Sequence, residues 1–80
     1  MKEEIIEFVN GEYVVDGSLV DENTRLIYGG ILDSFSMVSL KRFLEKKYSI
    51  SIPDGDFTPE TFDTVAAILQ LVRRQLARKD

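Results

Sequence analysis

Apolar residues recur at helical spacing in three stretches of the 80-residue chain. The first covers residues 2–10 and ends at an Asn-Gly pair, a typical helix stop, with continuation as far as residues 13–15 left open. The second, residues 34–48, has the clearest pattern and follows Asp33, a good N-cap residue. The third covers residues 64–78. These patterns predict three main helices, each with one apolar face.

A long loop is predicted between the first two of these helices, over residues 16–33. This segment is rich in turn-forming residues. It also holds apolar residues that we expect to pack on the core, namely Leu19, Val20, Leu26, Ile27, Ile31 and Leu32. A loop this long in a short chain is uncommon and tends to be functional.

The segment between the second and third main helices contains a connector and one short helix. Ile50 and Ile52 alternate with polar residues, which favours an extended connector that inserts both side chains into the core. Thr58 followed by Pro59 has the pattern of an N-cap and first turn. Asp63 or Thr64 then caps the last helix. We therefore predict an all-α fold with one domain over residues 1–80. It is a small four-helix bundle of three main helices and one short one, with a long loop between the first and second helices.

The composition excludes several kinds of chemistry. The chain has no Cys, His or Trp, so it lacks disulfides, a thiolate or imidazole metal site, a cysteine nucleophile and a histidine-based triad. No arrangement of carboxylates indicates an enzyme, and the DGD sequence at residues 54–56 is typical of a turn rather than a calcium loop. No apolar run is long enough to span a membrane, and no secretory pattern is visible, so we expect a cytoplasmic protein.

Charge is distributed unevenly along the chain. Residues 1–33 carry 2 basic and 8 acidic side chains, whereas residues 34–80 carry 8 basic and 6 acidic ones. The acidic first part argues against nucleic-acid binding. Two interpretations of the basic clusters stay open: solvated helix faces, or a docking surface for an acidic partner. The clusters are Lys41, Arg42, Lys46 and Lys47, and Arg73, Arg74, Arg78 and Lys79.

One serine occupies a chemically suggestive position. Ser34 falls in the first turn of the helix predicted over residues 34–48, where free backbone amides and the helix dipole favour negative charge. A phosphate ester there would be well placed. The spacing alone favours an ordinary serine near a helix cap over a modified one.

Residues 30–36, which read GILDSFS, extend this observation. Together with the order of helices, loop and connector, they make the whole chain resemble the acyl carrier and peptidyl carrier family. The usual residue after the serine in this family is Leu, and here it is Phe35. The resulting Asp-Ser-Phe sequence at residues 33–35 is similar to that of D-alanyl carriers and some stand-alone aminoacyl carriers. The resemblance implies that Ser34 bears a 4′-phosphopantetheine arm whose thiol holds an acyl or aminoacyl group as a thioester.

The same resemblance implies a non-catalytic protein that serves partner enzymes. A phosphopantetheinyl transferase would attach the arm from coenzyme A, a ligase would load it, and an acyl transferase or synthase would accept the cargo. The implied recognition residues are Asp33, Phe35, Met37, Val38, Lys41 and Arg42. Fatty-acid carriers resemble one another in having an acidic helix after the serine, so the basic helix here favours a specialised pathway. We expect a monomer. The alternative hypothesis is a helical protein-interaction module without a prosthetic group.

Overall fold

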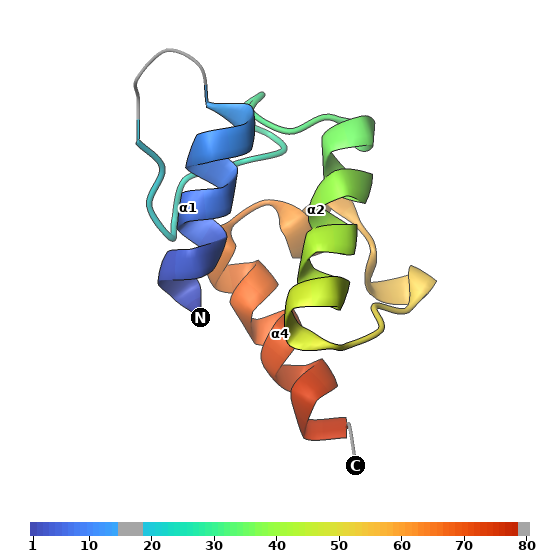
Figure 1. Cartoon of the computed structure of the whole chain (residues 1–80). Helices are drawn as coiled ribbons and strands as arrows, with labels where there is room; N and C mark the ends of the chain where they lie inside the picture. The colour runs from blue at the N-terminus through green and yellow to red at the C-terminus, as the bar shows by residue number, and fades with distance from the viewer. Residues whose placement is uncertain (15–18, 79–80) are drawn as a thin grey trace.

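The computed structural model describes residues 1–14 and 19–78 as helices joined by loops (Figure 1). In chain order, the segments are α1 (Lys2–Tyr13), α2 (Ser34–Tyr48), the 3₁₀ segment η1 (Asp54–Asp56), α3 (Pro59–Phe62) and α4 (Val65–Arg78). The helices share one apolar core, and these two described segments contain no strand. The predicted all-α bundle, with its long connection between the first two helices, is confirmed.

The helix α2 has the bounds that the sequence predicts, because both of its ends are set locally. Asp33 caps its start, and Ser49 ends it in the left-handed conformation with φ of 54°. The side chain of Glu45 then accepts a hydrogen bond from the backbone of Ile52 at 2.9 Å. This contact holds the connector after α2 in place, and Ile50 and Ile52 insert into the core as predicted.

The helix α1 continues past its expected end at residue 10. The Asn10 side chain does not terminate the helix; its Oδ1 accepts a hydrogen bond from the backbone N–H of Val20 at 3.0 Å. Tyr13 fixes the added turn, because its hydroxyl lies 2.9 Å from Ser39 Oγ on α2 and its ring packs edge-on against Phe8. Contacts between distant segments thus outweigh the local stop signal. The possible extension to Val15 and residues 16–18 of the predicted loop lie outside the described residues.

Local caps also set the last two helices. The Thr58 side chain accepts from the backbone N–H of Thr61 at the start of α3, as predicted. Thr64, one of the two predicted candidates, caps α4, because its hydroxyl accepts from the N–H of Ala67 at 3.1 Å. Asp63, the other candidate, has a different role that is described below.

The core is built from all the long helices and from the loop between α1 and α2. Val20, Leu26 and Leu32 of this loop are buried as predicted, whereas Leu19 is 83% exposed, so the expectation that it packs on the core is wrong. The largest fully buried side chains are those of Phe62, Ile5, Leu26, Leu40, Leu44, Ile68 and Leu71. The buried loop residues make the loop a structural part of the bundle.

Figure 1 shows how the loop reaches the start of α2. Both α1 and α2 contact α4. The rings of Phe8 and Phe43 stack between α1 and α2, with their centroids 3.8 Å apart. The described part of the loop crosses the bundle and enters α2 at the upper end of the view. The fold thereby places Ser34 at one end of the bundle.

Candidate functional site

Ser34 is the first residue of α2, and it is exposed. The cap of this helix is provided by its neighbour, because Oδ1 of Asp33 accepts a hydrogen bond from the backbone N–H of Ser36 at 2.8 Å. The Ser34 hydroxyl is therefore not needed to satisfy the helix end. It lies on the surface, where an enzyme can reach it.

The electrostatic environment of Ser34 combines two opposite influences. Hydrogen bonds from the backbone amide of Ser36, and then from its hydroxyl, hold the pKa of the Asp33 carboxyl below its ordinary value, so Asp33 is an anion at neutral pH. The start of α2 carries the positive end of the helix dipole and favours an anion such as a phosphodiester. The helix dipole would therefore favour a phosphate on Ser34, whereas the negative charge of Asp33 beside it would oppose one.

A sharp turn brings the chain to Asp33. The backbone amides of Ile31 and Leu32 both donate to the carbonyl oxygen of Leu26, at 2.9 and 2.8 Å. Gly30 has φ of 85°, a left-handed conformation that favours glycine. At Gly29, a Cβ atom would collide with the backbone carbonyl of Arg25, so a side chain is excluded there as well. The two glycines thus allow the backbone to make the turn that leads into α2.

The anchor of this turn is Asp63, the residue between α3 and α4. Its Oδ1 accepts from the backbone amides of Ile27 and Tyr28, each at 3.0 Å, and its Oδ2 is paired with the Arg25 guanidinium. Burial alone would raise the pKa of the Asp63 carboxyl, but the hydrogen bonds from the Tyr28 amide and from Arg25 outweigh burial and lower that pKa. Sequence reasoning missed this role, because Asp-Thr also has the pattern of a helix cap.

The side chains next to Ser34 differ in exposure. Phe35 is 85% exposed and Val38 is 40% exposed, so both are available to a partner. Met37 is only 8% exposed and belongs to the core. Packing leaves little of the Met37 side chain on the surface, and its expected contact with partner enzymes stays a prediction.

Comparison with known proteins identifies the family. No protein-family model matches the chain. The chain is 31% identical over 70 residues to the D-alanyl carrier protein of Streptococcus suis (strain 98HAH33), and the match covers 86% of each chain. The chain belongs to the D-alanyl carrier protein family. This result confirms the resemblance drawn from residues 30–36 and supports the role of a carrier protein.

In this carrier protein, some basic residues of α2 interact with acidic or aromatic side chains and others are exposed. Lys41 lies 3.9 Å from Glu45 and 5.5 Å from the Phe57 ring centroid. Lys47 lies 3.3 Å from Glu4, which lowers the pKa of that carboxyl together with the Tyr48 hydroxyl. Arg42 and Lys46 are exposed. Arg42 is thus an exposed cation on the helix that begins at Ser34.

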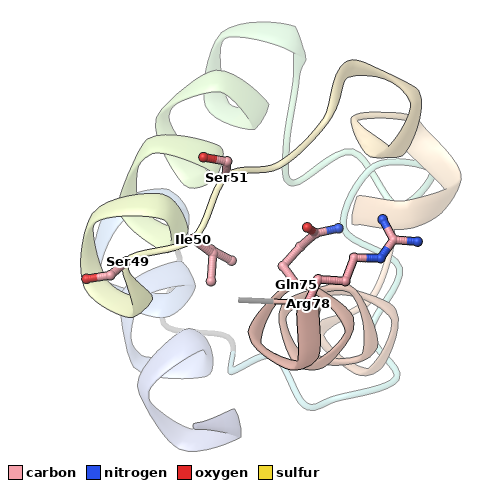
Figure 2. A pocket seen from close by; sticks show the side chains of 5 residues that line it. All are labelled: Ser49, Ile50, Ser51, Gln75 and Arg78. Atoms are coloured by element: carbon pink, nitrogen blue, oxygen red, sulfur yellow. The ribbon is translucent and has the colours of Figure 1, made fainter. Parts of the chain in front are cut away.

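A second basic region borders a hollow of about 240 Å³ at the other end of α2 (Figure 2). The hollow is lined by Ser49, Ile50, Ser51, Gln75 and Arg78. Figure 2 shows that its walls come from the segment after α2 and from the end of α4. Because α2 has 15 residues, this hollow lies about 22 Å from Ser34 along the helix. It is separate from the Ser34 site. Arg73 and Arg74 are exposed on α4, and Lys79 lies outside the described residues.

Two further observations concern metals and membranes. Within residues 1–14 and 19–78, no group of three acidic side chains gathers to hold a metal ion, and the DGD sequence forms the turn η1. None of the helices in these same segments has the length and apolar character needed to cross a membrane.

Proposed function

We propose that Ser34 bears a covalent 4′-phosphopantetheine arm, attached by a phosphopantetheinyl transferase that uses coenzyme A. The observation that carries the proposal is an exposed serine at the first position of α2, directly after the capping Asp33. The positive end of the helix dipole favours the phosphodiester of the arm. When attached, the arm supplies a thiol that holds the cargo as a thioester, which the chain itself cannot do because it has no cysteine.

The proposed cargo is an aminoacyl group, with D-alanine as the first candidate because the relative is a D-alanyl carrier protein. A dedicated ligase would load the arm, and an acyl transferase or synthase would accept the cargo. The protein would act by presentation, since tethering gives the cargo a high effective concentration at each docked active site. We further propose a cytoplasmic, monomeric protein with a single domain over residues 1–80 that binds no nucleic acid.

Partner recognition is proposed to use the exposed surface around Ser34. The candidate residues are Asp33, Phe35, Val38, Lys41 and Arg42. Phe35 and Val38 would supply apolar contact, and Arg42 would supply a cation that steers an acidic enzyme surface. Lys41 is only partly available, because Glu45 and the Phe57 ring engage it.

A mass measurement tests the attachment site. The apo protein is incubated with coenzyme A, Mg²⁺ and a broad-specificity transferase, and we expect the addition of one phosphopantetheine group. Ser34→Ala abolishes the addition, and the matched control Ser39→Ala, exposed on the same helix, retains it. Because Ser34 is not the cap, Ser34→Ala changes the free energy of unfolding by only about 0.5 kcal/mol or less. An unlabelled wild type would favour the alternative, an interaction module without a prosthetic group.

A loading assay tests the cargo. The phosphopantetheinylated protein is offered a D-alanine ligase with ATP, other amino-acid ligases and fatty acyl transferases. We expect ligase loading, slowed in Arg42→Glu and at higher ionic strength, because steering by exposed charge is screened by salt. Fatty acyl loading at an equal rate would refute the argument from the basic helix.

A further inference from the structure

Asp63 is a buried acid that the proposed chemistry does not use. It is 5% exposed and lies between α3 and α4, 29 positions after Ser34 in the sequence. A buried carboxylate is costly unless hydrogen bonds and a counter-charge satisfy it. Here the backbone amides of Ile27 and Tyr28 and the Arg25 guanidinium do so. All three partners belong to the loop that precedes α2.

A series of hydrogen bonds connects Asp63 with the start of α2. The carbonyl oxygen of Asp63 accepts from the backbone N–H of Leu26 at 2.5 Å. The carbonyl oxygen of Leu26 in turn accepts from Ile31 and Leu32, and Asp33 follows directly. Both the backbone and the side chain of Asp63 therefore hold residues 25–28, and these residues hold the turn that delivers Ser34.

The neighbouring contacts support the same anchor. The Tyr28 hydroxyl donates to Glu60 Oε2 at 2.7 Å, and the backbone N–H of Ala66 donates to the carbonyl oxygen of Glu22 at 3.0 Å. The loop thus has further attachments to α3 and α4 on each side of the Asp63 contacts. Asp63 is the buried centre of this set, whereas Tyr28 and Glu60 are exposed.

We propose that Asp63 is a positioning residue: it holds residues 25–32 in the arrangement that presents Ser34 to the phosphopantetheinyl transferase. This inference rests on the proposed function of Ser34. When the anchor is lost, the loop samples other arrangements, and the apparent affinity of the transferase falls in proportion to the population of the competent one. Asp63 touches no reacting atom, so its effect is on presentation and not on the transfer step.

The test compares rates of phosphopantetheine transfer to Asp63→Ala, Asp63→Asn and the wild type. Asparagine keeps an oxygen that can accept from the amides of Ile27 and Tyr28, but it lacks the charge for Arg25. We expect kcat/KM to fall about tenfold or more in Asp63→Ala and by a smaller factor in Asp63→Asn. Arg25→Ala removes the same ion pair from its exposed side but leaves the carboxylate charge unpaired, so we expect kcat/KM to fall at least as much as in Asp63→Asn.

A matched control separates positioning from a general loss of stability. Val72→Ala weakens the core on α4 but removes none of the hydrogen bonds that hold the loop, and well below its unfolding temperature it should be labelled at the wild-type rate. Amide hydrogen exchange supplies a local measurement. Exchange at Ile31 and Leu32 should accelerate in Asp63→Ala, while exchange at Leu40 within α2 should not change at the same temperature.

The outcomes distinguish the two proposals. If the wild type is labelled on Ser34 and Asp63→Ala is labelled at the same rate, Asp63 is not a positioning residue, and the proposed function stands. If Val72→Ala slows labelling as much as Asp63→Ala does, the effect is general and the inference is likewise overturned. If Asp63→Ala does not fold, Asp63→Asn and Arg25→Ala decide the question by the same comparison. An unlabelled wild type refutes the proposed function itself.

Discussion

Truncation of Leu26 tests whether the long loop belongs to the cooperative core. Leu26 is fully buried although it lies in the loop, and Leu26→Ala removes its packing against the core. Buried leucine truncations cost about 2–5 kcal/mol, from lost transfer free energy and from the cavity left behind. An 80-residue chain has a total stability on the order of 4–12 kcal/mol, so the variant should fold but be strongly weakened.

Urea unfolding followed by circular dichroism measures this effect. With an m value of about 1–1.5 kcal/mol/M, a loss of about 3 kcal/mol lowers the midpoint by about 2–3 M. The control is Leu19→Ala, a leucine of the same loop that is 83% exposed, and it should change the stability by about 0.5 kcal/mol or less. Equal, small effects of both substitutions would refute the reasoning, because they would mean that the loop folds apart from the bundle.

Two predictions concern the loop path and its anchor. Gly30→Ala should destabilise the protein by about 1 kcal/mol in thermal unfolding, because φ is 85° there, whereas Gly55→Ala, with open space around it, should be nearly neutral. The pKa of Asp63 is lowered in the folded state, so its contribution to stability is full above about pH 5 and is lost as the pH falls below about 4. Unfolding measured against pH should therefore show a shallower acid slope in Asp63→Asn than in the wild type, and equal slopes would contradict this.

Helix boundaries were predictable wherever side chains near in sequence set them. Asp33 and Thr58 each accept from an amide three residues away, so the starts of α2 and α3 follow from the sequence. The exposure of Ser34 was also predictable, because the apolar positions of α2 leave position 34 outside the core. The family resemblance rested on these same local features.

Only the tertiary structure decided the features that depend on distant partners. Helix α1 continues past Asn10 because Tyr13 finds Ser39 on α2, and no local signal encodes that contact. Leu19 is exposed while Leu26 is buried, although both are leucines among turn-forming residues. The spacing of apolar residues predicts which of them share a helix face, but it does not predict which residues a loop side chain packs against.

Asp63 is the clearest example of a residue whose role depends on distant partners. The sequence offered two adjacent residues that could cap α4, and local geometry satisfies that end with Thr64 alone. The carboxylate of Asp63 was then free to accept from amides more than thirty residues away, in a loop that the fold brings beside it. The sequence thus determined that α2 begins at Ser34. The packing of the loop against α3 and α4 decided what holds that serine in place, since a buried charge takes its partners from three-dimensional proximity.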